Sequence, residues 1–196
     1  MNSYIGLREA TRTAVHTAFV QGLSAEFWQS LDHEQVVVLK YPIQAVAYPI
    51  VHLDVTFGPT RWAGLTAAPQ NRSPTTGERL LTGDATIGVE IYARSALQRD
   101  KWVDGLETLV ACSDMLNASA FRAALTTDKV CVQPIAASIQ NQGDVESQDI
   151  PWMGKDPCFM TGFSFYTKIT YLFDLQQAAA LVKHIQTDAT SGAADA

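Results

Sequence analysis

Two segments of the chain alternate apolar and polar residues with a period of two, and a long polar stretch separates them. The first is "IVHLDVTF", residues 50–57, and the second is "ATIGVEIYA", residues 85–93. Their apolar positions are Val51, Leu53, Val55 and Phe57 in the first segment and Ile87, Val89 and Ile91 in the second. This alternation is typical of a strand with one buried face. We therefore predict two strands that pair as a hairpin around a long loop.

The stretch between them, Phe57–Arg79, is predicted to be that loop. Loops longer than about 12–15 residues are uncommon in compact domains and are usually functional or disordered. This one has a single acidic residue, Glu78, and is locally positive in a chain of net charge -6. Tryptophan and arginine are enriched in interface hot spots. We predict a subunit or partner interface at Arg61, Trp62, Arg72 and Arg79.

A second polar connection, Gln140–Pro157, is acidic and carries Trp152 and Met153. A positive loop and a negative loop on one molecule favour a head-to-tail contact between identical subunits, which closes into a ring where the rotation permits. Trp152 and Met153 join the predicted interface on this ground. The alternative is that both loops fold back on their own domain, with the tryptophans as plugs. Doubling the length of a loop costs only about 0.6 kcal/mol, so stability does not decide between the two.

The rest of the chain predicts helices and further strands. Ser95 is an N-cap candidate with Gln98 three residues on, a capping box that begins a helix to about Asn117 with Leu97 in its apolar stripe. The other predicted helices are Ser3–Leu23, Ser24–Leu31 and Ser119–Leu125. The other predicted strands are Val36–Pro42, Lys129–Ile139, with Pro134 marking an edge, and an aromatic closing strand at residues 163–173.

These elements predict an α+β fold with two layers, a largely antiparallel sheet with helices packed on one face. No Gly/Ser linker divides the chain, so residues 1–175 are predicted to form a single domain. Residues 176–196 are predicted to add a short Ala-rich helix, Gln176–Gln186, and a disordered tail that has no residues with which to build a core.

Composition excludes several classes of protein. The chain is 47% hydrophobic and 17% charged, which is typical of a folded protein. The chain is acidic overall, and it lacks the clustered lysines and arginines of a nucleic-acid-binding domain. Three widely spaced cysteines indicate no disulfide framework, and no apolar run is long enough to cross a membrane. We expect reduced thiols in a cytoplasm and no membrane partner.

Catalytic motifs are lacking in the sequence. No glycine-rich phosphate loop, HExxH zinc motif or nucleophile elbow is present. His52 and Asp54 share one face of a predicted strand and could hold a metal or pair as base and orienting group. The ordinary interpretation is the solvated face of that strand, since a site needs a third group and the sequence indicates none. We predict no catalytic, cofactor-binding or metal residue, with a small metal-dependent hydrolase using His52 and Asp54 as the alternative.

The order of elements resembles a known family. The chain has an amphipathic start near "IGLREATRTAV", a central hairpin with a long loop, a helix of the "ALQRDKWVDGLETLVACSDML" kind and an aromatic closing strand, "GFSFYTKITYLF". Together they resemble the tail terminator, or tail-completion, proteins of long-tailed bacteriophages, and related head–tail connector and neck proteins. The resemblance covers about Tyr4 to Asp174 and is one of layout, without a signature motif.

The resemblance implies a structural virion protein that uses no cofactor and is not an enzyme. Such a subunit assembles as a ring, usually a hexamer, on the last ring of tail-tube protein, stops tube polymerisation and presents a surface to the head–tail connector. DNA would pass through the pore without sequence-specific binding, and the protein would lie at the head-proximal end of the tail in the virion. This chain differs from a family member of minimal size in three segments: the long first loop, the Gln140–Pro157 connection and the C-terminal extension. They leave a neck, connector or baseplate role open.

Overall fold

The computed structural model describes residues 6–23, 31, 33–39, 48–62, 78–113, 119–147 and 158–174. The helices in these ranges are α1 (Leu7–Gly22), α3 (His33–Val36), α4 (Ala96–Ala111), α5 (Ala120–Leu125) and the 3-10 turn η3 (Ala136–Ser138). The strands are β1 (Val37–Val38), β2 (Ile50–Trp62), β3 (Glu78–Ala93), β4 (Val130–Pro134), β5 (Gln140–Asn141), β6 (Val145–Ser147) and β7 (Cys158–Asp174).

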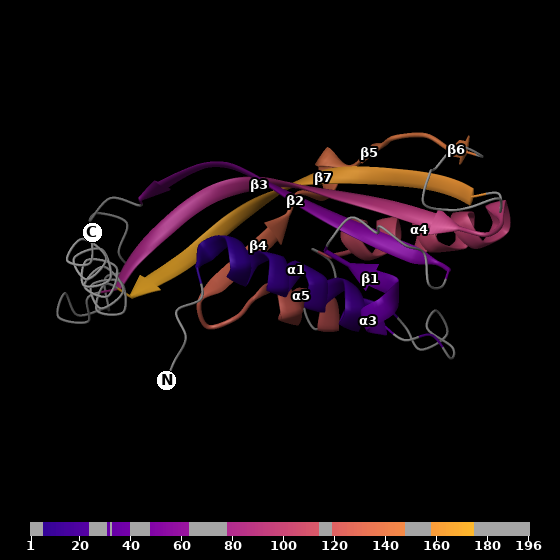
Figure 1. Ribbon diagram of the computed structural model, residues 1–196. Helices are drawn as coiled ribbons and strands as arrows, with labels where there is room; N and C mark the ends of the chain where they lie inside the picture. Colours follow the sequence, from indigo (N-terminus) through magenta and orange to yellow (C-terminus); the bar gives the residue numbers. More distant parts are fainter. Residues whose placement is uncertain are drawn as a thin grey trace, which may run out of the picture.

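All of these strands join one sheet, with the order β1-β2-β3-β7-β4, and β5 and β6 also pair with β7 (Figure 1). Only β1 runs parallel to its neighbour, β2, and the other pairings are antiparallel. Strands β3 and β7 pair from Glu78 opposite Asp174 to Ala93 opposite Phe159. The predicted α+β class, with a largely antiparallel sheet, is therefore confirmed, as is the predicted hairpin of β2 and β3.

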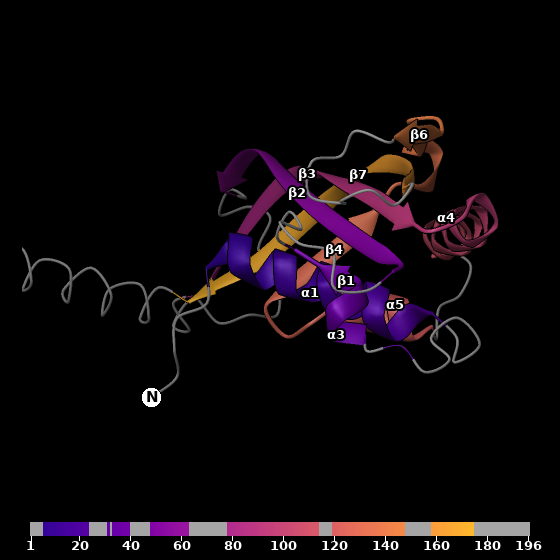
Figure 2. The same cartoon turned by 45° about the vertical axis from the view of Figure 1, so that its right-hand side comes forward.

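The helices pack on one face of this sheet. Figures 1 and 2 show α1, α3 and α5 side by side beneath the strands, with α4 at one end. Alternate residues of the strands point toward the helices and form one core with them. Its buried members include Val51, Leu53, Ile87, Val89, Phe163 and Phe165 from the sheet and Val15, Phe19, Leu106 and Phe121 from the helices. One apolar face per strand and one layer of helices thus complete the core.

Helix α4 begins as the capping box predicts. The side chain of Ser95 accepts a hydrogen bond from the backbone N–H of Gln98 at 3.2 Å. The helix ends at Ala111, before the predicted Asn117, and residues 114–118 lie outside the described ranges. Leu97 was predicted to be in the apolar stripe, but it is 82% exposed. Trp102 is buried, and a separation of five residues turns a helix by about 140°, so Leu97 points away from the core.

The prediction of an unstructured Phe57–Arg79 loop is wrong at both ends. Strand β2 continues to Trp62, and β3 already begins at Glu78. The pairing resumes from Thr60 opposite Gly83 after a register shift between Phe57 and Thr60. Gly58 and Pro59 favour a loop in the sequence, but a bulge accommodates both without ending the strand. Only residues 63–77 remain between the two strands, and they lie outside the described ranges.

Two further predictions need correction. In the predicted Val36–Pro42 strand, Val36 instead ends helix α3 and β1 covers Val37–Val38, while residues 40–42 lie outside the described ranges. The polar connection Gln140–Pro157 contains β5 and β6, which pair with β7 although their sequences lack an apolar alternation. Their backbone hydrogen bonds to a long neighbouring strand require no apolar side chain, so no periodicity reveals them.

The predicted strand Lys129–Ile139 is too long, because β4 ends at Pro134 and the 3-10 turn η3 follows. The other predictions agree with the described ranges or fall outside them. Helix α1 covers most of the predicted Ser3–Leu23, and α5 begins after Ser119, whose side chain caps it. Strand β4 lies at the end of the strand order, so the edge position predicted from Pro134 is confirmed. The predicted helices Ser24–Leu31 and Gln176–Gln186 and the C-terminal tail lie outside the described ranges, apart from Leu31. None of the helices described here has the length and apolar character needed to cross a bilayer.

Candidate functional site

The face of the sheet opposite the helices is the candidate functional surface. No described helix packs on this face, and it is formed by the even-numbered residues of β3 and β7 and by their neighbours on β2. Across the strands, its rows are His52–Glu90–Gly162, Asp54–Gly88–Ser164, Thr56–Thr86–Tyr166 and Arg61–Thr82–Thr170. Hydroxyls, carboxylates and cations therefore cover a face that the described helices leave open.

His52 and Glu90 form a short polar contact on this face. They are direct partners in the register of β2 and β3, and the distance between His52 Nδ1 and Glu90 Oε2 is 2.9 Å. The hydroxyl of Tyr92 donates to the same Oε2, also at 2.9 Å. A carboxylate only accepts hydrogen bonds, so Nδ1 of His52 carries the proton. His52 is 8% exposed and is held by its partners.

These contacts stabilise Glu90 in its charged form. The hydrogen bond from His52 lowers the pKa of Glu90 below its ordinary value of 4.5, burial opposes this change, and the Tyr92 hydroxyl adds to the lowering. Glu90 is thus a permanent acceptor at neutral pH. A carboxylate with a lowered pKa is a poor general base, so the contact supports the β2–β3 pairing better than it supports proton transfer.

Asp54 does not pair with His52, as a metal site or a pair of base and orienting group would require. It lies two residues from His52 on the same face, as the alternation predicts, but it is exposed and its Oδ2 accepts from the hydroxyl of Thr56 at 3.0 Å. His52 has Glu90 as its partner instead. Within the ranges that the structure describes, no group of three or more His, Cys, Asp or Glu residues could hold a metal ion. The third group that such a site needs is therefore missing from these ranges.

Beside His52, the open face ends in a small apolar cluster. Ile50, Tyr92 and Cys158 are buried there, and Met160 and Tyr48 pack against them. The guanidinium of Arg94 lies 5.3 Å from the centre of the Tyr48 ring. Burial raises the pKa of the Cys158 thiol, while a backbone hydrogen bond from Ala93 lowers it by less. This thiol is a packing residue and a weak nucleophile.

The other end of the open face carries charge. Arg61 lies near the end of β2, and Asp84 and Lys168 are direct partners across β3 and β7. These residues line a shallow hollow of about 420 Å³ together with threonines of the same strands. Arg61 and Lys168 supply two cations there against one carboxylate, which suits contact with a charged or polar surface.

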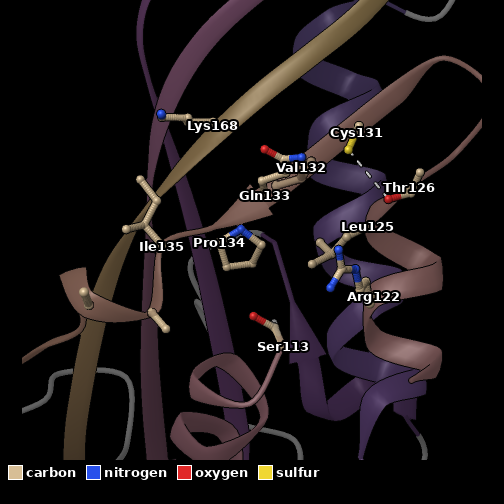
Figure 3. Close-up of a pocket in the computed structure, with 12 residues that line it drawn as sticks. Ser113, Arg122, Leu125, Thr126, Cys131, Val132, Gln133, Pro134, Ile135 and Lys168 are labelled. Carbon is tan, nitrogen blue, oxygen red and sulfur yellow. Dashed lines mark hydrogen bonds between the residues drawn. The ribbon is translucent and has the colours of Figure 1, made fainter. Parts of the chain in front are cut away.

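A second hollow, of about 670 Å³, lies between β4 and α5 (Figure 3). Its lining includes Ser113, Arg122, Leu125 and Pro134. The hydroxyl of Ser113 is buried and has no hydrogen-bond partner within the described ranges. Cys131 also lines the hollow, where its Sγ contacts the hydroxyl of Thr126, and no described lining residue is a histidine or a carboxylate. This hollow offers a surface for binding and no assembled catalytic group.

The structure places some of the predicted interface residues and leaves others out. Arg61 is exposed on β2, Trp62 ends that strand, and Arg79 pairs with Phe173 near the start of β3. Arg72, Trp152 and Met153 lie outside the described ranges. Sequence reasoning missed Glu90 and Lys168. Each has an even-numbered position on an alternating strand, and only the register shows which residue it faces.

The comparisons with known proteins found no match among protein-family models or curated proteins.

Proposed function

We propose that this chain is a structural virion protein of a long-tailed bacteriophage, a tail terminator that assembles as a ring on the end of the tail tube. In this role it stops tube polymerisation and offers a joining surface to the head–tail connector. Residues 1–175 act as one structural unit in this proposal. The ring, usually a hexamer in the family that the chain resembles, would be assembled in the host cytoplasm and retained in the virion.

The observation that carries the proposal is the one-sided construction of the sheet. Strands β3 and β7 pair over the whole length of β3, and the described helices close one face only. A subunit of this kind has a rigid wall, and the exposed part of its polar face, which includes Arg61, Tyr166 and Lys168, is available for neighbours. The hydrogen bonds of that face join its own side chains, as in Glu90 with His52 and Tyr92, and this supports a role in contact more than a role in chemistry.

Termination needs two unlike surfaces on the same ring. One surface must copy the docking face of a tube subunit, and the opposite one must fail to recruit another tube subunit. The net charge of -6 is compatible with a pore through which DNA passes, since like charges repel. Contact residues such as Arg61 would then act at the subunit or ring boundary.

The test is a polymerisation assay with the tail-tube protein encoded in the same genome. Increasing amounts of this chain should shorten the tubes, and electron micrographs should show a cap at one end only. Native mass measurement of the ring released from the tube should give a multiple of the 21.4 kDa chain. Unchanged tube lengths with no cap would contradict a terminator role.

The same material separates the alternatives. Binding to a connector or baseplate protein, without any effect on tube length, would favour a neck or baseplate role. Metal-dependent hydrolysis that is lost on His52→Ala, in a chain that leaves tubes unchanged, would favour the hydrolase. Matched Thr170→Ala protein serves as the control, because Thr170 lies on the same face of the sheet in a row that contains neither His52 nor Asp54.

A further inference from the structure

Two exposed surfaces at opposite ends of the molecule carry complementary charge. We propose that they meet between neighbouring copies of this chain, so that helix α4 of one copy docks on the α1–β2 end of the next. The inference rests on the proposed ring only in requiring that copies associate. It names the contact surfaces, which the ring proposal leaves open.

The first surface, the basic end, is built around Phe57 of β2. The guanidinium carbons of Arg8 and Arg12, one turn apart on α1, lie 5.6 and 5.5 Å from the centre of the Phe57 ring. Both arginines are exposed, and no acidic side chain of the described ranges forms an ion pair with either. Arg61, four residues beyond Phe57, lies on the opposite face of the sheet because of the register shift, so the basic end consists of Arg8, Arg12 and Phe57. Unpaired arginines over a half-buried aromatic ring are typical of interface residues.

The second surface, the acidic end, is the outer side of α4. Leu97 is 82% exposed, the most exposed large apolar side chain in the described ranges. Asp100 and Asp104 lie three and seven residues on and therefore share its side of the helix. Asp104 is exposed and forms no ion pair within the described ranges. An isolated exposed leucine is ordinary, but one flanked by carboxylates matches an aromatic ring flanked by guanidinium groups.

Asp144 adds to the acidic end. The buried Arg99 bonds both Asp100, at 2.8 Å, and Asp144, at 2.9 Å. The single guanidinium of Arg99 thus contacts two carboxylates. Through Asp144 it holds the segment after β5 against helix α4. Lys101 is exposed on the same helix. The carboxylates remain in excess, and Asp100 and Asp144 keep 53% and 60% of their side-chain surface exposed.

The two surfaces cannot meet within one chain. Phe57 pairs with Ala85, and β3 runs from there to Ala93 before α4 begins, a distance of about 26 Å at the rise of a strand. Figure 1 shows α4 and the end of β2 at opposite ends of the sheet. A contact between unlike ends is heterologous, and it closes into a ring or continues as a filament. This is the geometry that a terminator ring needs.

A charge-swap experiment tests the contact through sedimentation velocity. The variants are Arg12→Glu, which alters only the basic end, and Asp104→Arg, which alters only the acidic end. Each variant alone places like charges in the contact and should weaken self-association at least about tenfold. In an equimolar mixture the two variants can alternate, so that each altered end meets the altered end of its neighbour and each native end meets a native one. Every contact then joins opposite charges, and the mixture should associate to within about threefold of wild type.

Two controls guard the result. Asp54→Arg makes the same charge change at an exposed position on the face of the sheet opposite the helices, and it should associate like wild type. Arg8→Glu repeats the basic-end change at a second position, and circular dichroism checks that each variant keeps its fold. If the wild type self-associates and the single variants associate equally well, the proposed contact is wrong, although the ring proposal is unaffected. The same conclusion follows if the mixture of variants does not recover self-association. A wild-type chain that stays monomeric with and without tube protein would overturn both.

Discussion

His52 and Glu90 face each other across the β2–β3 ladder, with 2.9 Å between Nδ1 and Oε2, and Tyr92 donates to the same carboxylate oxygen. The pairing joins a histidine that sequence reasoning connected with Asp54 to a residue that it did not consider. It also gives the fold a dependence on pH.

The carboxyl of Glu90 should stabilise the fold above its unfolded pKa and lose that contribution in acid. Its pKa is lowered in the folded protein from the ordinary 4.5, chiefly by the His52 hydrogen bond, so protonation favours the unfolded chain. Wild-type stability should fall as the pH drops below 4.5. Glu90→Gln should be less stable at neutral pH by roughly 1–2 kcal/mol and should show a weaker loss in acid. Urea unfolding on both sides of pH 4.5 measures this, with Asp128→Asn as the exposed control.

Gly22 should not tolerate a methyl group. A Cβ at this position would lie 2.8 Å from Leu109 Cδ2 and 2.9 Å from Phe121 Cβ, where α1 approaches α4 and α5. Overpacking of this kind costs about 1–3 kcal/mol, which exceeds the gain in helix propensity near a helix end. Thermal unfolding of Gly22→Ala should show the loss. Gly88→Ala is the control, since its nearest neighbour would be Asp54 Cβ at an ordinary 3.8 Å, and equal melting temperatures would disprove the close packing.

Ser95 should contribute to stability through its cap alone. Its side chain is exposed and accepts from the backbone N–H of Gln98, so Ser95→Ala leaves one N–H of α4 without its partner. A loss of about 1 kcal/mol is expected. Ser95→Asp should retain most of the stability because a carboxylate also caps. A Ser95→Asp protein that is as unstable as the alanine variant would argue against the cap.

The cysteines should differ in reactivity. Cys158 is buried with a raised pKa, whereas Cys112 and Cys131 are partly exposed. In the folded protein, iodoacetamide should label Cys112 and Cys131 before Cys158, because the thiolate is the reactive form. Mass spectrometry of partially labelled protein gives the order. Equal labelling in denaturant, where burial is lost, is the control, and early labelling of Cys158 in the native state would contradict its packing.

The sequence was most informative where one residue acts locally. The alternation of Val51, Leu53 and Val55 predicts β2 because a single buried face decides it, and Ser95 predicts the start of α4 because a cap acts within one turn. The face of α4 could not be predicted in the same way. Leu97 fits a helical apolar pattern, but Trp102 decides which side is buried, and that depends on the packing of α4 against the sheet.

The candidate surface was the least predictable part. Arg61, Trp62 and Arg79 were identified as contact residues of a loop, yet strand pairing continues past Gly58 and Pro59 and places them on β2 and β3. Local composition favours a loop at those two residues, and only the partner strand reveals the bulge. The partners of His52 and Lys168 depend on the register of the strands. The geometry of the connecting loops helps to set this register, and the sequence does not give that geometry.

The full-length pairing of β3 with β7 has a mechanical consequence. Hydrogen bonds of an antiparallel ladder lie perpendicular to the strands, so tension applied along the strands loads all of the bonds in shear at once. Tension across the strands would break them one after another. A subunit held by the two ends of this ladder is therefore stiffest along its long direction, and it would transmit a pull from one neighbour to the next without unravelling.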